Sequence, residues 1–154
     1  MNRATEPSEH TVHVDAPPRA VFDHLRDPRN YVGLSPLVIE ARDIRTDGGL
    51  LHYVAVERFR FLGFLRYDNR IAVTLRADDT DPERLVVSGD VDSPGKVQLA
   101  YAYEISPEGT GSRVVDRIAV TAPWGLRRFA AGRAGAVQLA RGRILADRLA
   151  GATA

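Results

Sequence analysis

A single long helical segment closes this chain and follows a middle region whose pattern is almost entirely that of β-strands. The segment runs from Leu126 to Leu149 and is rich in alanine. Because the chain has one long helix and many strands, that helix must cover one large sheet. An arrangement of this kind tends to leave a cavity between the helix and the sheet.

The expected helix carries mostly small residues on the face toward the sheet. Glycines at positions 132, 135 and 142 interrupt the segment, and each interior glycine costs about 1 kcal/mol relative to alanine. Such a face covers a sheet without filling the space beneath it. Steps of 100° per residue place on it Leu126, Phe129, Ala130, Val137, Ala140 and Ile144, with Arg127, Arg128 and Arg143 directed away.

Seven strands are predicted before this helix. Two short helices should follow the first strand, one around Ala20–Leu25 and one around Asn30–Leu34. The connections are too short for parallel crossovers, so we expect an α+β fold with an antiparallel sheet curved strongly around the final helix. Alternation and turn residues place the strands at His10–Asp15, Val38–Arg45, Leu51–Phe61, Phe64–Arg76, Leu85–Val91, Val97–Ile105 and Arg113–Thr121.

Length and composition indicate one domain. The chain has 154 residues, of which 44% are hydrophobic and 27% charged, as in ordinary globular proteins. We expect residues 1–8 to form a disordered or loosely held tail and residues 9–150 to form a single domain. No apolar stretch approaches the ~20 residues of a membrane span, no signal segment is visible, and cysteine is absent. A soluble cytoplasmic protein is therefore expected.

Several classes of function are disfavoured. The arginines of the last third are spread around the helix, so no nucleic-acid-binding stripe is expected. His10 and His13 face opposite sides of one strand and cannot bind one metal together. The chain contains no nucleophile elbow, phosphate loop or dinucleotide fingerprint. No metal and no cofactor are predicted.

Polar side chains are predicted on the inward faces of three strands. Alternation places Tyr67 and Asn69, Tyr101 and Tyr103, and Asp116 inside the sheet. Phenols and an amide among apolar residues suit a pocket for an apolar or aromatic molecule with a few oxygens, although tyrosines are also common in ordinary cores. On the strand Leu51–Phe61, alternation does not decide whether residue 57 (Glu) or residue 58 (Arg) points inward.

Asp116 is the most unusual of these residues, because an ionised carboxylate on an apolar strand face requires a partner. Arg133 lies within the predicted inward face of the helix, and we hypothesise that it contacts Asp116 at the cavity wall, directly or through water. The alternative is a purely structural Asp116 that accepts a hydrogen bond from a tyrosine, with Arg133 turned outward. If burial in a dry pocket raised its pKa, Asp116 could also act as a catalytic base, and it is the candidate catalytic residue.

Short motifs at both ends of the chain carry a resemblance to a known family. They are Val12–Phe22 with Leu25–Pro28, and Gly111–Ile118 with Pro123–Leu126 and the helix that follows. Over residues 9–150 the chain resembles the polyketide cyclase/START-like superfamily, also called SRPBCC or birch-pollen-allergen-like. The resemblance implies a helix-grip fold with a cavity for hydrophobic ligands. Many relatives carry tryptophan after the first helix, where this chain has Tyr31–Pro36.

The leading hypothesis is a protein that binds a small hydrophobic molecule, polyketide-like, aromatic or lipid, in a cavity between sheet and helix. One alternative is a polyketide cyclase or aromatase that uses the same cavity, with Asp116 in proton transfer. Another is an interaction module with a vestigial cavity, which predicts a collapsed interior and an exposed apolar patch. The candidate ligand-binding residues are Tyr67, Asn69, Tyr101, Tyr103, Asp116, Phe129, Arg133 and Val137.

Overall fold

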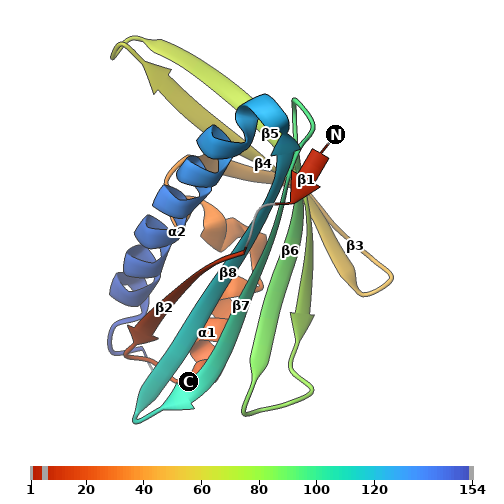
Figure 1. The fold of residues 1–154 in the computed structure, drawn as a ribbon. Coiled ribbons are helices and arrows are strands. Elements are labelled where there is room, and N and C mark those ends of the chain that lie inside the picture. Colours follow the sequence, from red (N-terminus) through yellow and green to blue (C-terminus); the bar gives the residue numbers. More distant parts are fainter. Residues whose placement is uncertain (1, 5–6, 153–154) are drawn as a thin grey trace.

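One curved antiparallel sheet and one long helix dominate the computed structural model, which describes residues 2–4 and 7–152 (Figure 1). The helix lies along one side of the sheet, and α1 packs against β6, β7 and β8. The elements in chain order are β1 (Asn2–Ala4), β2 (Ser8–Val14), α1 (Pro18–Leu25), η1 (Pro28–Tyr31), β3 (Val38–Asp47), β4 (Leu50–Phe61), β5 (Leu65–Asp78), β6 (Leu85–Ser93), β7 (Val97–Glu108), β8 (Gly111–Pro123), η2 (Trp124–Leu126) and α2 (Arg127–Leu149).

All seven predicted strands are present, and β1 is added to them. The strand order is β1-β8-β7-β6-β5-β4-β3, and β2 also pairs with β8. Ala4 lies opposite Thr121 on β8, and Ser8 lies opposite Ile118. Within the expected loose tail over residues 1–8, residues 2–4 and 8 lie in strands of the sheet. Residues 1, 5 and 6 lie outside the described residues.

Both short helices begin at a proline. Pro18 occupies the first turn of α1, where a missing N–H costs nothing, and the helix buries Val21, Phe22 and Leu25. The second is a 3₁₀ helix, η1, which starts two residues earlier than predicted. The Asp27 side chain accepts a hydrogen bond from the backbone N–H of Arg29 and so caps the start of η1, whose first residue is Pro28. In the described part of the chain, no helix has the length and apolar composition of a bilayer span.

The inward face of α2 is rotated from the predicted one. Leu126 and Phe129 remain 44% and 68% exposed, although both border the interior. The prediction placed apolar residues on the inward face. At 100° steps, however, the polar residues 138 and 141 share a face with the alanine at 134 and the leucine at 145, and this mixed face is the buried one. The buried residues of α2 are Ala134, Gln138, Arg141, Gly142, Leu145 and Leu149.

One of the interior glycines of α2 has a packing role. A methyl group at Gly142 would lie 3.1 Å from Cδ2 of His10, so this glycine allows α2 to approach β2 closely. A methyl group at Gly132 or Gly135 would meet open space. Only Gly142 is thus explained by the contact between helix and sheet.

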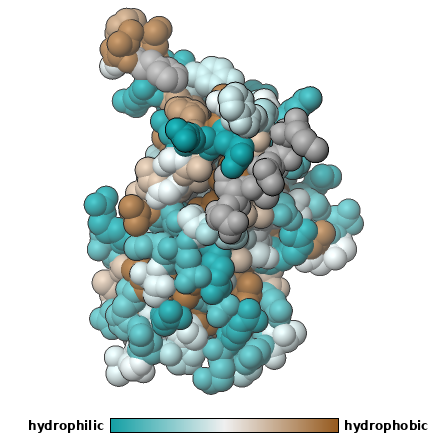
Figure 2. All heavy atoms as spheres, in the orientation of Figure 1, coloured by the Kyte–Doolittle hydropathy of each residue, from teal (hydrophilic) through white to brown (hydrophobic). Residues whose placement is uncertain are grey.

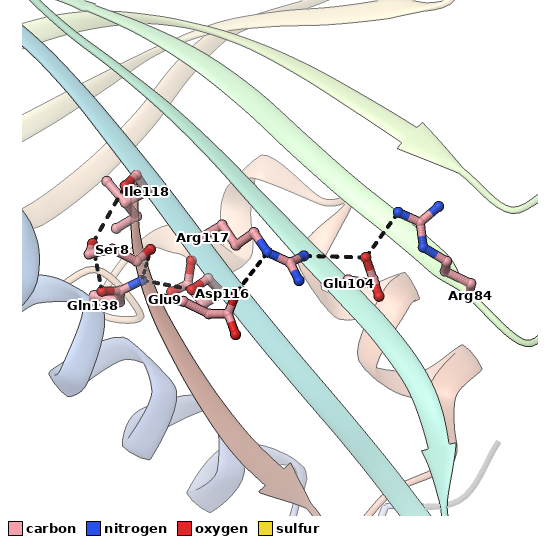
Figure 3. A network of polar contacts seen from close by, with 8 residues as sticks. All are labelled: Ser8, Glu9, Arg84, Glu104, Asp116, Arg117, Ile118 and Gln138. Atoms are coloured by element: carbon pink, nitrogen blue, oxygen red, sulfur yellow. Dashed lines mark hydrogen bonds and ion pairs between the residues drawn. The ribbon is translucent and has the colours of Figure 1, made fainter. Parts of the chain in front are cut away.

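Polar contacts fix the position of α2 along the sheet (Figure 3). The Gln138 Nε2 donates to the carbonyl oxygen of Asp116 at 2.7 Å and to that of Ser8 at 3.3 Å. The Ser8 hydroxyl donates back to Gln138 Oε1 at 3.1 Å. Because Gln138 joins β2 and β8 to the helix, it sets which residues of α2 face which residues of β8. A separate ladder of ion pairs crosses the strands through Glu9, Arg117, Glu104 and Arg84.

Candidate functional site

A cavity of about 290 Å³ lies between the sheet and α2. This is close to the lower end of the range for small-molecule pockets, about 300–1,000 Å³. The structure therefore leaves a small hollow at this position. The apolar part of the wall comes from β3 to β8 and from α2, and includes Val38, Ala55, Ile71, Val73, Val91, Leu99, Ile118, Val120, Ala130, Ala134 and Val137.

Four tyrosines cluster at this cavity. Tyr31 comes from η1, Tyr53 from β4, and Tyr101 and Tyr103 from β7. The Tyr101 ring centroid lies 6.1 Å from that of Tyr31 and 5.8 Å from that of Tyr103. Tyr101 fits because its cross-strand neighbour is Gly89, where an added methyl carbon would lie 2.5 Å from the phenol ring. Tyr31, Tyr53 and Tyr101 line the cavity, whereas Tyr103 lies behind it.

Three of the four hydroxyl groups in this cluster lack a well-aligned hydrogen-bond partner within the described part of the chain. Those of Tyr31, Tyr101 and Tyr103 are buried, and none has a well-aligned hydrogen-bond partner among the described residues. The Tyr31 and Tyr101 hydroxyls lie close enough to shift each other's pKa, but not in the geometry of a good hydrogen bond. Burial raises the pKa of Tyr31 and of Tyr101, so both phenols stay protonated and keep an O–H to donate. A buried hydroxyl without a partner lowers the stability of the fold by about 1–3 kcal/mol. A ligand oxygen that accepts a hydrogen bond from such a hydroxyl would recover part of this free energy.

Arg141 and Asp116 form a buried ion pair beneath the cluster. Their side chains are 6% and 2% exposed. The Arg141 Nε donates to Asp116 Oδ2 at 2.6 Å, and a second hydrogen bond joins Arg141 Nη2 to Asp116 Oδ1. The guanidinium carbon also lies 5.2 Å from the ring centroid of Tyr101 and 4.8 Å from that of Tyr103. Arg141 lines the cavity, and Asp116 holds it in place from behind.

The predicted contact between Asp116 and Arg133 is wrong. Arg133 lies at the exposed edge of the cavity, with its guanidinium carbon 4.9 Å from the ring centroid of Phe59 and 5.7 Å from that of Phe129. Since Gln138 binds the backbone of Asp116, the helix register brings Arg141, about one turn further along, to the carboxylate. The partner of Asp116 is thus an arginine rather than a tyrosine, and Asp116 does not line the cavity.

Glu57 is the acidic residue on the cavity wall, which the sequence left undecided. It points inward beside Phe59, whereas Arg58 points outward and makes two hydrogen bonds with Asp68 at 2.7 and 2.8 Å. Burial raises the pKa of Glu57, and this effect is opposed by its cross-strand neighbour Asn69 and by the positive charge of Arg133. A carboxyl group in this setting holds a proton at higher pH than a solvated one.

The predicted ligand-binding residues divide into two groups. Tyr67 is 57% exposed, because the β4–β5 hairpin extends beyond the part of the sheet that α2 covers (Figure 1). Tyr103 and Asp116 are buried behind Arg141 instead of reaching the cavity surface. The residues that do line the cavity are Asn69, Tyr101, Phe129, Arg133 and Val137.

Other cavity residues were missed by the sequence reasoning. Arg141 is one of several arginines spread around the helix, and its charge gave no indication of an inward side chain. Tyr31 and Tyr53 were not selected, although Tyr31 lies in the segment where relatives were expected to carry tryptophan. That position was the one signal in the sequence that η1 contributes to the cavity.

Comparisons with known proteins identify the family. The family model described as polyketide cyclase/dehydrase and lipid transport matches residues 7–151, and the chain belongs to this family. A search of curated proteins gave no significant match.

Solved structures confirm the helix-grip fold. The ZhuI aromatase/cyclase from Streptomyces sp. R1128 has a TM-score of 0.74 at 16% identity, over 97% of this chain and 94% of that one. The structure of Ara h 8.0201 gives a TM-score of 0.62 at 11% identity, over 93% of this chain and 98% of that one. The di-domain aromatase/cyclase BexL of the BE-7585A biosynthetic pathway gives 0.66 at 15% identity, over 95% of this chain and 50% of that one.

Proposed function

We propose that the protein binds a small, largely apolar molecule bearing one or more oxygens in the cavity between the sheet and α2. The observation that carries the proposal is the pair of cavity-lining phenols, Tyr31 and Tyr101, whose buried hydroxyls have no well-aligned hydrogen-bond partner among the described residues. Buried polar groups in proteins are almost always hydrogen-bonded. A hydroxyl or carbonyl group on a ligand is the partner that this geometry fits.

Affinity and orientation would come from different parts of the cavity. The apolar wall contributes about 25 cal/mol for each Å² of apolar ligand surface that it removes from water. The phenols donate hydrogen bonds, and the guanidinium of Arg141 adds positive charge at the same end. This combination favours an aromatic or polyketide-like molecule with a carbonyl, enol or phenol group at its inner end.

The experiment compares 2-naphthol with naphthalene, which differ by one hydroxyl group. We expect the protein to prefer 2-naphthol by about 2-fold to 10-fold, the value of one net hydrogen bond. Replacement of Tyr31 or Tyr101 by phenylalanine should reduce this preference and leave naphthalene binding nearly unchanged. Tyr67→Phe is the matched control, because Tyr67 is exposed and does not line the cavity. Equal preference in all four proteins would contradict the proposal.

A second pair of variants tests where the probe binds. Ala130 lines the cavity, so Ala130→Trp should occupy it and abolish 2-naphthol binding. Ala136 is an exposed residue of the same helix, and Ala136→Trp should bind as the wild type does. If both variants bind equally well, the probe lies elsewhere.

Glu57 favours a second candidate function, a polyketide cyclase or aromatase activity in the same cavity. A carboxyl with a raised pKa next to a bound carbonyl can donate a proton to it or accept one from a neighbouring carbon. Glu57→Gln should then abolish aromatisation of a linear poly-β-ketone, followed by aromatic absorbance, while 2-naphthol still binds. Asp116→Asn is less informative, because it removes the partner of a buried arginine.

A further inference from the structure

The most exposed large apolar side chains gather at one end of the molecule. Trp124 is 84% exposed, Leu62 81%, Phe64 75% and Phe129 68%, the four highest values among the large apolar residues described. Leu62 and Phe64 form the turn of the β4–β5 hairpin, which projects beyond the sheet next to the first turns of α2 (Figure 1). In Figure 2 the tip of this hairpin is a protruding apolar group. We call these four residues the apolar tip.

The turn at the end of the hairpin has a composition that the fold does not require. Leu62 has φ +53°, in the left-handed region, followed by Gly63 at φ +77°. A leucine in this conformation costs about 1–2 kcal/mol, whereas asparagine or glycine adopts it readily and would also be more soluble. Backbone strain and a solvated leucine at one position indicate that the side chain serves an interaction.

Unpaired positive charge surrounds the apolar tip. Arg60 and Arg66 are exposed and face each other across the hairpin, an arrangement that repels, and neither forms an ion pair among the described residues. Residues 57–70 and 123–133 together hold seven arginines and two acids, a net charge of +5, whereas the whole chain carries +1. The first turn of α2 has no acidic residue, so arginines stand at the positive end of the helix dipole. This end of the molecule is suited to an anionic partner.

The order of the residues along the hairpin favours a lipid surface over a protein. Arg60 and Arg66 stand two residues behind the turn residues Leu62 and Phe64, which is about 7 Å along a strand. Apolar groups of peripheral proteins enter a bilayer by about 5–10 Å, which leaves cations that lie this far back among the phosphates. A protein partner would need a socket shaped to the protruding hairpin, whereas a bilayer accepts a convex tip.

We propose that this end of the protein docks on an anionic phospholipid surface, with Leu62 and Phe64 inserted and Arg60 and Arg66 at the phosphate level. Phe129 both belongs to the apolar tip and lines the cavity, so docking turns the edge of the cavity toward the bilayer. A hydrophobic ligand then passes between membrane and cavity with little exposure to water. This last consequence rests on the proposed function, whereas the docking itself does not.

Sedimentation with vesicles tests the proposal on the full chain. The wild type should bind vesicles made of phosphatidylcholine with one third phosphatidylserine, bind phosphatidylcholine alone far less, and dissociate as salt is raised. Arg60→Gln with Arg66→Gln should weaken binding about 30-fold, from the loss of two phosphate-level charges. Leu62→Asn with Phe64→Ser should weaken binding at both low and high salt.

A matched control separates docking from net charge. Arg113 and Arg143 are exposed, form no ion pair among the described residues and lie away from the hairpin, so Arg113→Gln with Arg143→Gln makes the same change in charge. This control should bind anionic vesicles nearly as the wild type does. The proposal is overturned if the wild type does not sediment with anionic vesicles, or if the two arginine pairs weaken binding equally. Retention on immobilised poly-glutamate without vesicle binding would also overturn it, in favour of an acidic protein partner.

The same proteins keep this test independent of the cavity. None of the residues replaced on the hairpin lines the cavity, so 2-naphthol binding should be unchanged in every variant. Loss of vesicle binding with 2-naphthol binding retained supports docking as a separate property. Vesicle binding in a protein that binds no 2-naphthol would leave docking standing and remove the proposed function.

Discussion

The buried pair of Asp116 and Arg141 makes the sharpest energetic prediction. Both side chains are almost fully buried and share two hydrogen bonds, so removal of one partner leaves the other charged and unpaired. Such a change costs about 3–5 kcal/mol, a large part of the 5–15 kcal/mol that stabilises a typical domain. With a urea dependence of about 2 kcal/mol per M, Asp116→Leu should lower the unfolding midpoint by about 2 M.

The double variant shows whether the cost comes from the isolated charge. Asp116→Leu with Arg141→Met leaves no buried charge, so most of the lost stability should return, apart from about 0.5–2 kcal/mol of contact between the guanidinium and the Tyr101 and Tyr103 rings. Urea unfolding followed by circular dichroism gives the interaction free energy from the four proteins.

An exposed pair provides the control for burial. Arg58 and Asp68 share the same two-bond geometry on the outer face of the β4–β5 hairpin. Asp68→Asn should therefore move the midpoint very little. The reasoning is refuted if Asp116→Leu changes the free energy of unfolding by less than about 0.5 kcal/mol, or if the two single effects simply add.

Three further predictions follow from individual contacts. Gly89→Ala should cost about 1–3 kcal/mol in thermal unfolding and weaken 2-naphthol binding, since its methyl group would displace the Tyr101 ring; unchanged stability would contradict this contact. The pKa of Glu57 is raised in the folded protein, so its carboxyl destabilises the fold increasingly as pH rises from its ordinary pKa through the raised value. In urea unfolding, Glu57→Gln should therefore be more stable than the wild type at pH 7 but not at pH 4. The same stability difference at both pH values would contradict this prediction. Arg148 donates to the carbonyls of residues 30 and 32 at 2.6 and 2.8 Å, so Arg148→Ala should speed amide hydrogen exchange around Tyr31 and leave β7 unaffected; unaltered exchange there would show that the segment does not need it.

The fold could be predicted from the sequence because its signals are local. Alternation along β5 places Ile71, Val73 and Leu75 on one face, and all three are buried. Short turns between strands exclude parallel crossovers, which leaves an antiparallel sheet. Alternation identifies a face but does not show how far its cover extends, and for this reason Tyr67 lies on the predicted face yet remains exposed beyond α2.

The pairings within the site could not be predicted, because they depend on the register of α2 against β8. Arg133 and Arg141 are both arginines of one helix, and the contact of Gln138 with the Asp116 backbone decides which one reaches the carboxylate. The close approach of Gly142 to His10 also helps to fix this register. A contact of this kind leaves no periodic pattern in the sequence. Tyr31 lies in a 3₁₀ segment without strand or helix periodicity, so its inward direction was not visible either.

A crystal structure of the protein soaked with 6-bromo-2-naphthol tests the central claim most directly, because the bromine locates the probe by its anomalous signal. The account predicts bromine density in the cavity between the sheet and α2, with the naphthol oxygen about 2.5–3.0 Å from the hydroxyl of Tyr31 or Tyr101. Bromine density only outside this cavity, or a naphthol oxygen directed away from both phenols, would contradict it.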